Sequence, residues 1–319
     1  MLVCSDADVS DLLDLSELLP VIADAFERQG RGAVERPDRP HFPVGAGLDG
    51  DDPLGTALTM PAYLHGDETY ATKLASVHPD NPPERPSVHA QILLTDARTG
   101  DPTALLAGDR ITNARTGCIG GLAVERLAEP PVEVGVIGAG AQARWQTRAI
   151  DAAVEVDTVR IYSPSDSRHV CARDLQTRGI PARSVNAPGE AVAEADVVVT
   201  ATTATEPTFP PGALTDGTLV VAVGAYTAET QELPPAVVER AARPYADVPD
   251  EAAETGDLLG TDHVELTPFS TAVAGGEPRV GPEEIVLVKS VGTAVLDAAT
   301  GRHVLAAARE AEAGESVEL

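Results

Sequence analysis

The stretch that decides the fold is Val132-Glu-Val-Gly-Val-Ile-Gly-Ala-Gly-Ala-Gln-Ala-Arg144. An apolar run enters the turn Gly138-Ala139-Gly140, and a helical pattern opens directly after it. Glycines at such a turn let the backbone bend sharply and let a pyrophosphate approach the free N–H groups of the helix. Ala143 stands where the dinucleotide-binding fingerprint has its third glycine, and a second strand follows about 20 residues later. The stretch therefore predicts a dinucleotide-binding strand–turn–helix unit.

The rest of this region repeats the alternation of strand and helix. Strand-like runs at 132–138, 158–162, 195–201 and 218–223 are separated by helical stretches, which predicts a doubly wound parallel α/β sheet of the Rossmann type. Ligands of such sheets bind at the carboxyl ends of the strands. We therefore expect cofactor contacts at the ends of these runs, from Gly138, Gly140, Ala141, Gln142, Thr202 and Val223. Gln142 either contacts the phosphates or caps the helix.

The residues after the second strand bear on the choice of cofactor. No acidic residue stands at the tip of 158–162 to hold a ribose 2′-hydroxyl, which weakens the case for NAD. Ser163, Ser165 and Arg168 would suit a 2′-phosphate, whereas Asp166 would suit a plain ribose. We expect NAD(P)(H), with a slight preference for NADP(H).

The N-terminal part has a different pattern. Asp8–Gly30 predicts an amphipathic helix or helix pair, and 31–68 is rich in Pro, Gly and Asp. Tyr70–Ala75 and Ala90–Thr95 are strand candidates, and the helical run Ile111–Leu127 follows them. These elements predict a smaller α+β domain, an open sheet with helices, before the Rossmann domain.

Composition excludes several classes of protein. Asp and Glu number 50 against 23 Lys and Arg, so the formal charge of −27 disfavours nucleic acid as a partner. No apolar run approaches the roughly 20 residues of a membrane helix, and the acidic N-terminus lacks the basic segment of a signal peptide. Three scattered cysteines predict neither disulfides nor a metal site. We expect a cytoplasmic protein adapted to high salt; a merely acidic protein from a GC-rich bacterium is the alternative.

Lysine is almost absent from the chain. Lys73 and Lys289 are the only lysines, so the other 21 of the 23 basic residues are arginines. Because most surface roles of a cation can pass to arginine, a retained lysine indicates a role that needs a compact ammonium group.

An ordered set of motifs resembles the ornithine cyclodeaminase/mu-crystallin family, which includes archaeal alanine dehydrogenase and ketimine reductases. The resemblance covers nearly the whole chain. Its motifs are Pro37-Asp-Arg-Pro-His-Phe-Pro-Val44, Met60-Pro-Ala62, Thr72-Lys-Leu74, Leu93-Leu94, Thr112-Asn-Ala-Arg-Thr116, Gly138-Ala-Gly-Ala-Gln-Ala143, Val223-Gly-Ala225, Glu232-Leu233 and Lys289-Ser-Val-Gly292.

The resemblance implies two domains with different functions. Residues 1–115 with 295–319 would form a domain that binds a small amino or imino acid and dimerises through its sheet. Residues 116–294 would form the NAD(P)-binding Rossmann domain. The implied assembly is a homodimer, with neither a membrane nor a nucleic acid as partner.

The resemblance also assigns residues near the substrate. Arg39 matches the arginine that holds the α-carboxylate, a role suited to a planar guanidinium. Lys73 matches the active-site lysine, which binds the carboxylate and donates a proton as the imine is reduced. Met60 and Gln91, which replaces a family threonine, are further expected substrate contacts.

Other positions are expected near the cofactor. The resemblance places Arg115 and Thr116 beside the cofactor phosphates and the substrate carboxylate, at the start of the connecting helix, where the helix dipole favours anions. It places Ser290 and Val291 against the nicotinamide and its ribose. Lys289, next to them, is expected to be structural.

Two departures from the family bear on the reaction. The aspartate and lysine that cyclodeaminases carry after Val223-Gly-Ala225 are replaced here by Tyr226 and Thr230, whereas Glu229 aligns with the aspartate of mu-crystallin-like ketimine reductases. We therefore expect an NAD(P)H-dependent reductase of a cyclic ketimine such as Δ1-pyrroline-2-carboxylate, with Lys73, Arg39 and Glu229 as catalytic residues. The second expected reaction is the reductive amination of a 2-oxo acid, as in alanine dehydrogenase. Ornithine cyclodeamination, with Glu229 as the acid, and a non-catalytic nucleotide or ligand binder are the alternatives.

Overall fold

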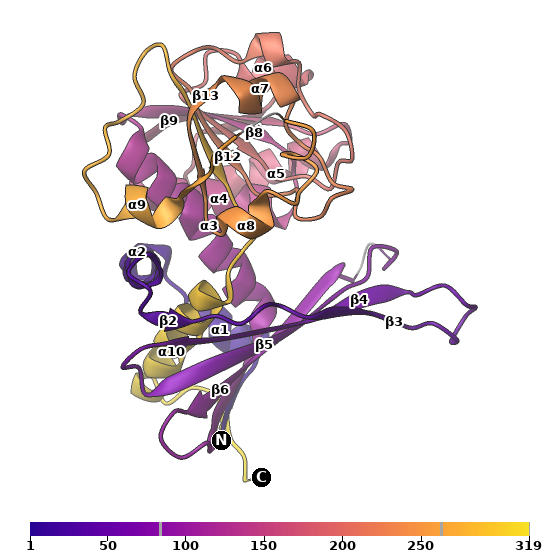
Figure 1. The fold of residues 1–319 in the computed structure, drawn as a ribbon, viewed down its shortest axis with the longest axis vertical. Helices are drawn as coiled ribbons and strands as arrows, with labels where there is room; N and C mark the ends of the chain where they lie inside the picture. The colour runs from indigo at the N-terminus through magenta and orange to yellow at the C-terminus, as the bar shows by residue number, and fades with distance from the viewer. Residues whose placement is uncertain (83–84, 262–263, 319) are drawn as a thin grey trace. The chain divides into compact units, whose positions relative to one another are not determined.

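The structure is a computed structural model that describes residues 1–82, 85–261 and 264–318 (Figure 1). It divides into two compact units: unit 1 is Met1–Arg115 with Thr293–Leu319, and unit 2 is Thr116–Gly292. The chain first crosses from unit 1 to unit 2 within helix α3 (Gly108–Leu127).

The N-terminal helical segment of unit 1 is a pair of helices, α1 (Asp6–Leu12) and α2 (Leu15–Gly30). The break between them has a local cause, because the Asp14 side chain accepts hydrogen bonds from the N–H groups of Ser16 and Glu17 and so caps a new helix. The apolar face of α2 is buried, including Leu18, Ile22 and Phe26.

The sheet of unit 1 has, within the described residues, eight strands in the order β16-β1-β7-β6-β5-β4-β2, with β3 paired to β4. The longest of these strands, β4, lies within 31–68, where the sequence predicted no strand. The sequence of β4 shows no clear apolar–polar alternation, which is why the strand was not predicted. The strands are β1 (Leu2–Cys4), β2 (Val34–Glu35), β3 (His41–Val44), β4 (Gly55–Leu64), β5 (Thr69–Val77), β6 (Val88–Asp96), β7 (Pro102–Ala107) and β16 (Glu315–Ser316).

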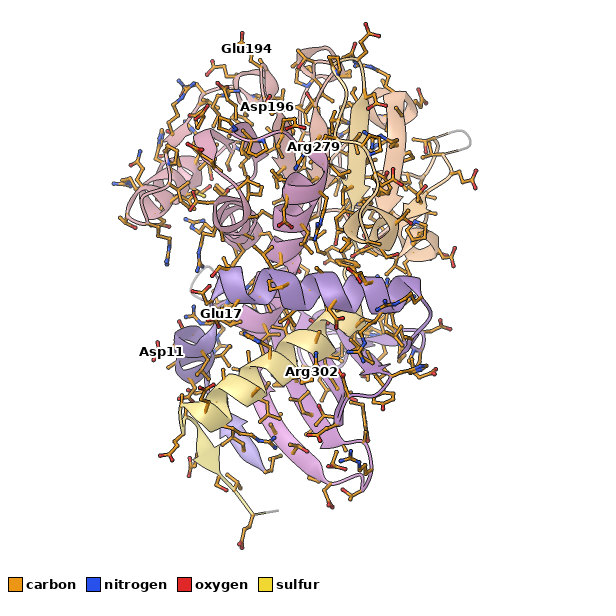
Figure 2. All side chains as sticks on the ribbon, turned by 90° about the vertical axis from the view of Figure 1, so that its left-hand side faces the viewer. Asp11, Glu17, Glu194, Asp196, Arg279 and Arg302 are labelled. Carbon is orange, nitrogen blue, oxygen red and sulfur yellow. The ribbon has the colours of Figure 1, made fainter. Side chains whose placement is uncertain are left out.

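The register of this sheet determines which side chains face the helices. Met60 on β4 and Ile92 on β6 pair with Lys73 on β5, so these three side chains point to one face. Helix α10 (Ala294–Glu310) packs on that face against β4, β5 and β6, and α2 packs against α10. Figure 2 shows the two helices, with Glu17 labelled on α2 and Arg302 on α10.

Unit 2 is a Rossmann-type α/β domain. Its described strands form one parallel sheet in the order β10-β9-β8-β11-β12-β15-β13-β14. The strand order reverses between β8 and β11, which is the position where such folds bind ligands. The strands are β8 (Val132–Ile137), β9 (Val156–Tyr162), β10 (Ala182–Ser184), β11 (Val197–Thr200), β12 (Leu219–Ala222), β13 (Ala241–Ala246), β14 (Thr267–Pro268) and β15 (Ile285–Lys289).

The four strand-like runs predicted from the sequence correspond to β8, β9, β11 and β12, whereas β10, β13, β14 and β15 were not anticipated. The connecting helices are α4 (Ala141–Ala153), α5 (Ser167–Gln176), α6 (Pro188–Val192), the 3-10 turn η1 (Pro211–Ala213), α7 (Pro235–Arg240), α8 (Pro249–Ala252) and α9 (Phe269–Val273). Over the described ranges, no helix has both the length and the apolar character needed to cross a membrane.

Candidate functional site

The candidate substrate site of unit 1 is built around Lys73. Its side chain is 2% exposed and points from β5 toward α10, where its Nζ lies 2.6 Å from Oδ2 of Asp297. The other oxygen of the same carboxylate, Oδ1, accepts a hydrogen bond of 2.9 Å from Nε of Arg115 on α3. One buried carboxylate therefore holds two cations from two other elements.

The charges of this cluster do not balance. Burial lowers the pKa of Lys73, Asp297 opposes that effect, and the charges of Arg115 and Arg39 add to it, so that the pKa lies at about 8. Burial acts to raise the pKa of Asp297, but Arg115 and Lys73 outweigh it and hold that pKa below its ordinary value. Arg39 is half-buried between β2 and β3. Two cations share the one carboxylate of Asp297, and this net positive pair is suited to a carboxylate ligand.

The expected setting of Arg115 is wrong. Helix α3 begins at Gly108, so Arg115 lies about two turns inside it and gains nothing from the helix terminus. Arg115 is buried, with 5% of its surface exposed. Its neighbour Thr116, also buried, accepts a hydrogen bond through its carbonyl oxygen from Nε2 of Gln146, at 2.7 Å.

Asp297 was missed by the reading of the sequence, although a signal was present. It is the one charged residue in the apolar run 291–299, which leads into helix α10. A carboxylate buried there needs a cation or several donors, since burial of an unpaired charge is costly.

The register of the sheet places Met60 and Gln91, the two other expected substrate contacts, on opposite faces. Met60 is buried beside Lys73 on the face covered by α10. Gln91 pairs with Leu74, whose side chain is 51% exposed, and therefore lies on the opposite face of the sheet from Lys73. The expectation that Gln91 contacts the same ligand as Lys73 receives no support from this geometry.

The glycine-rich turn of unit 2 has the geometry that a dinucleotide needs. Gly138 has φ +119°, and a Cβ there would collide with the carbonyl oxygen of Ala201, so only glycine fits. Gly140 is the N-cap of α4 and provides no side-chain cap, and a Cβ built on it would meet nothing within 4 Å. The first N–H groups of α4, which begins at Ala141, thus lie directly after the turn at which such a fold binds a pyrophosphate. The side chain of Gln142 accepts a long hydrogen bond, 3.5 Å, from Nε2 of Gln146.

The loop after β9 gathers hydroxyl groups and one guanidinium. Oγ of Ser167 lies 3.2 Å from Oγ of Ser163 and 2.6 Å from Oγ of Ser165. Nη1 of Arg168 donates to the carbonyl oxygens of Ser163 and Ser165, at 3.2 and 2.8 Å. The side chain of Asp166 is almost fully exposed.

A buried carboxylate organises the ends of β11 and β12. Glu232 accepts hydrogen bonds from Oγ1 of Thr200 at 2.9 Å and from the backbone N–H groups of Thr202 at 2.6 Å and Gly224 at 2.7 Å. Burial raises the pKa of Glu232. The backbone N–H of Val223 donates to the carbonyl oxygen of Thr200 at 3.0 Å. Thr202 and Val223 thus lie at the edge where the fold binds ligands.

Asp247 plays the corresponding part for the segment after β15. Its carboxylate accepts from Oγ of Ser290 at 2.7 Å and from the N–H groups of Val291 at 3.0 Å and Gly292 at 2.8 Å. Neither Glu232 nor Asp247 was identified as an anchor from the sequence, because the contacts are long-range.

Glu229 is not part of these networks in the described structure. It is exposed in the turn after β12, where Oγ1 of Thr230 accepts from the N–H groups of Tyr226 and Thr227, both at 3.1 Å. Tyr226 is 44% exposed.

The second lysine forms a separate buried pair. Lys289 is fully buried, and its Nζ donates to Oδ2 of Asp257 at 2.8 Å and to the carbonyl oxygen of Ala225 at 2.5 Å. These contacts tie β15 to the chain that follows β12, which fits the structural role expected for Lys289.

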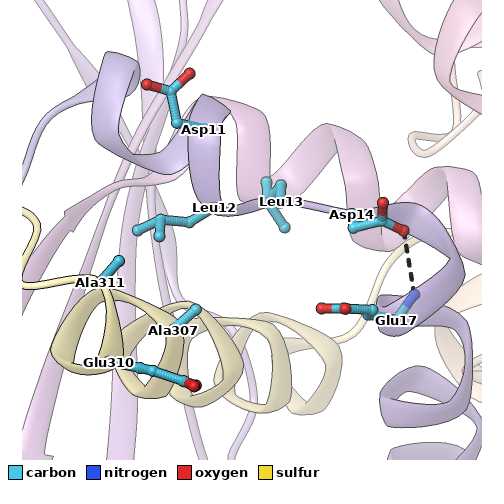
Figure 3. Close-up of a pocket in the computed structure, with 8 residues that line it drawn as sticks. All are labelled: Asp11, Leu12, Leu13, Asp14, Glu17, Ala307, Glu310 and Ala311. Atoms are coloured by element: carbon cyan, nitrogen blue, oxygen red, sulfur yellow. Dashed lines mark hydrogen bonds between the residues drawn. The ribbon is translucent and has the colours of Figure 1, made fainter.

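An acidic groove in unit 1 is unrelated to the Lys73 cluster (Figure 3). It has a volume of about 360 Å³ and is lined by Asp11, Leu12, Leu13, Asp14, Glu17, Ala307, Glu310 and Ala311. Asp14 already serves as the cap of α2. Across the described residues, no group of three or more His, Cys, Asp or Glu side chains could hold a metal ion.

Comparison with known proteins identifies the family. The sequence model of the ornithine cyclodeaminase/mu-crystallin family matches residues 1–312. The chain is 31% identical over 334 residues to a Δ1-pyrroline-2-carboxylate reductase of Bacillus cereus, covering 100% of both chains. The structure of Thermococcus litoralis Δ1-pyrroline-2-carboxylate reductase in complex with NADH and L-proline is similar with a TM-score of 0.91 at 31% identity, over 99% of this chain and 100% of that one.

An archaeal alanine dehydrogenase, solved as a dimer with bound NAD, is similar with a TM-score of 0.89 at 26% identity, over 100% of this chain and 99% of that one. These relatives are named Δ1-pyrroline-2-carboxylate reductase and alanine dehydrogenase, and the matches span both units of this chain. The chain belongs to the ornithine cyclodeaminase/mu-crystallin family.

Proposed function

We propose that this protein is an NAD(P)H-dependent reductase of a small cyclic imino acid, with Δ1-pyrroline-2-carboxylate as the leading substrate and L-proline as its product. The observation that carries the proposal is the pair of buried cations, Lys73 and Arg115, on the single carboxylate of Asp297, with the charge of Arg39 also acting on Lys73. It offers an excess of positive charge to a carboxylate and an ammonium group able to give up a proton. The relatives named for the same reaction supply the substrate class.

In this proposal the side chains of unit 1 bind the substrate and supply the proton. Arg39 and the outer nitrogens of Arg115 hold the α-carboxylate, and Met60 forms part of the apolar wall beside it. Lys73 donates a proton to the imine nitrogen as the carbon–nitrogen double bond is reduced. The chemistry that a bound dihydronicotinamide supplies is hydride transfer to the imine carbon. The gain of one hydride and one proton converts the imine to the amine.

Unit 2 has the groups to hold the dinucleotide. In the proposal, the N–H groups at Gly140, Ala141 and Gln142 bind the pyrophosphate, with Arg115 and Thr116 near the phosphates. Ser290 and Val291, whose segment Asp247 fixes, lie against the nicotinamide and its ribose. Thr202 and Val223, at the strand ends that Glu232 fixes, complete the expected contacts.

We propose a slight preference for NADP(H) over NAD(H). The supporting feature is the group of Ser163, Ser165 and Arg168 after β9, in which hydroxyls and a guanidinium gather without a carboxylate at the strand tip. The Thermococcus and archaeal relatives were solved with NADH and NAD. The comparison of kcat/KM for NADPH and NADH, in the native protein and in Arg168→Ala, tests the preference. A native preference for NADH that Arg168→Ala leaves unchanged would refute it.

We propose a homodimer assembled through the sheet of unit 1. The face opposite α10 exposes Leu74 at 51%, and Phe42, which pairs with Ala57 on the same face, at 52%. The archaeal alanine dehydrogenase is a dimer. Light scattering should give twice the 33.0 kDa chain mass for the native protein and a smaller mass for Leu74→Glu; a native monomer would contradict the proposal.

We further propose a cytoplasmic protein that works in high salt. The net charge of −27 supports the second part, because self-repulsion at low salt is screened at about 1 M. The three cysteines are buried and unpaired in the described structure, in keeping with a reducing compartment. Activity that falls as KCl rises from 0.1 to about 2 M would argue against the adaptation to salt.

The reaction is tested by a substrate panel at high salt, with each cofactor. The proposal predicts oxidation of NAD(P)H by Δ1-pyrroline-2-carboxylate and a weaker rate with pyruvate plus ammonia. Ornithine with NAD⁺ should release no ammonia. If pyruvate plus ammonia is the faster substrate pair, the protein is an alanine dehydrogenase, and if ornithine reacts, Glu229 becomes the candidate acid of a cyclodeaminase. If every substrate is inert while the cofactor binds, the protein is a binder.

A further inference from the structure

We propose that Asp297 is the positioning residue of the substrate site: it holds the ammonium of Lys73 in its protonated form and turns the guanidinium of Arg115 so that its outer nitrogens face the substrate carboxylate. The expected effect on catalysis rests on the proposed function. The effect of Asp297 on the protonation of Lys73 does not depend on which substrate is reduced.

The geometry gives Asp297 two separate contacts. Oδ2 lies 2.6 Å from Nζ of Lys73, and Oδ1 accepts from Nε of Arg115 at 2.9 Å. Among the described contacts, Arg115 uses only Nε in this way, so Nη1 and Nη2 keep the paired geometry that binds a carboxylate through both oxygens. The carboxylate therefore orients the guanidinium without occupying its recognition edge.

The position of Asp297 in the fold makes the carboxylate rigid. It lies in the first turn of α10, whose N-cap Thr293 bonds the N–H of Val295, and it is 0% exposed. An acidic side chain in the first turn of a helix is stabilised by the helix dipole. Lys73 lies on the long strand β5, so both partners are fixed by regular structure rather than by loops.

The electrostatics explain why Lys73 needs this partner. The charged groups that act on Lys73 come from three elements: Asp297 on α10, Arg115 on α3 and Arg39 in the segment before β3. Burial and both arginines favour the neutral amine, and Asp297 alone among these groups favours the ammonium. Without Asp297 the amine would be neutral at neutral pH and could not donate a proton to an imine.

The composition of the chain offers a direct test. Because Lys73 and Lys289 are the only lysines, a protein labelled with ¹³C and ¹⁵N in lysine gives two side-chain signals, and Lys73→Arg assigns them. Lys73 should titrate near pH 8 in the native protein. In Asp297→Asn, its midpoint should fall by about 1–3 pH units, the usual effect of an opposite charge at this distance.

Asp67 provides the matched control. Its side chain is 7% exposed, lies in the same unit and also holds two cations, Arg28 and Arg302, at 2.9 and 3.0 Å. Asp67→Asn should leave the midpoint of Lys73 unchanged. If Asp297→Asn leaves the midpoint at its native value, or if Asp67→Asn lowers it equally, the inference is overturned.

A second variant covers the case in which Asp297→Asn does not fold. Arg115→Gln removes a cation and leaves the carboxylate of Asp297 to Lys73 alone, so the midpoint should rise. A midpoint that stays or falls would overturn the inference.

Kinetics complete the test if the substrate panel is positive. At pH 7.5, Asp297→Asn should lose about 10²-fold or more in kcat, partly recovered at lower pH, and the KM for the carboxylate substrate should rise. An unchanged KM with an unchanged pH profile contradicts the inference. An inactive native protein would instead refute the proposed function, while the titration of Lys73 would still decide the role of Asp297.

Discussion

The two lysines of this chain occupy similar places with different charge balances. Each is buried and paired with a buried aspartate, Lys73 with Asp297 in unit 1 and Lys289 with Asp257 in unit 2. Around Lys289 the ammonium donates to a carboxylate and to a backbone carbonyl, and Asp257 also accepts from the N–H groups of Glu232 and Leu233. In unit 1, two cations, Lys73 and Arg115, share the one carboxylate of Asp297.

This difference separates a structural ion pair from a site. A pair whose donors and acceptors are satisfied within the fold offers nothing to a ligand, and the loss of one partner destabilises the fold. A cluster with surplus positive charge is incomplete until an anion binds. Burial alone does not distinguish the two lysines, whereas the count of charges does.

The largest effect on activity is expected from the loss of Lys73. Lys73→Ala should reduce kcat for Δ1-pyrroline-2-carboxylate by about 10²–10⁴-fold, because the proton donor is removed. The dissociation constant of the cofactor, measured by fluorescence titration, should change little because the glycine turn belongs to unit 2. Retention of native kcat by the variant would remove Lys73 from the mechanism.

The loss of Lys289 should instead act on stability. Lys289→Ala leaves Asp257 buried without its cation and should cost about 3–5 kcal/mol in the free energy of unfolding. Lys73→Ala should cost less, since Arg115 still pairs with Asp297. Urea unfolding of both variants checks the order; a greater loss of stability in Lys73→Ala would contradict the comparison.

The glycine turn should separate folding from cofactor binding. Gly140→Ala has room for its methyl group and an ordinary φ of −82°, so the free energy of unfolding should be nearly native. Because that space is where the pyrophosphate is proposed to bind, the dissociation constant of NAD(P)H should rise about tenfold or more, a loss of about 1.4 kcal/mol. Gly138→Ala, with φ +119° and a collision with Ala201, should lose both stability and binding. Native affinity in Gly140→Ala would place the phosphates elsewhere.

The pH dependence of reduction should report the ammonium of Lys73. Its pKa is lowered to about 8, so the protonated donor is present below that pH and disappears above it. The value of kcat/KM for reduction should therefore fall about tenfold per pH unit above pH 8. Lys73→Arg, whose guanidinium stays charged, should lack this fall in whatever activity remains. A native profile that stays flat to pH 10 would rule out Lys73 as the donor.

The sequence predicted the Rossmann class of unit 2, with four of its eight described strands, and named the cationic residues of unit 1. The glycine turn and the strands β8, β9, β11 and β12 have strong local signals in glycine spacing and apolar runs. Arg39 and Lys73 came from the resemblance to the family; the structure pairs Lys73 with Asp297 and brings Arg39 close enough for its charge to act on Lys73.

What the sequence did not predict depends on contacts between distant residues. Asp297 meets Lys73 only because α10 returns to the sheet of unit 1, more than 200 residues later in the chain. The sequence also could not show that Gln91 lies on the face of the sheet opposite Lys73, because the face of a strand residue depends on the register. Asp247 and Glu232 accept hydrogen bonds from backbone N–H groups, and every non-proline residue has such a group, so no residue type in the sequence indicates these contacts.

The most direct test of the account is a titration of the lysine-labelled protein with L-proline in the presence of NAD(P)⁺. The account predicts that the side-chain signal of Lys73 shifts in a saturable way while that of Lys289 stays fixed, and that Arg39→Ala weakens the binding. If L-proline binds and the Lys73 signal does not move, the carboxylate site lies elsewhere and the account is wrong.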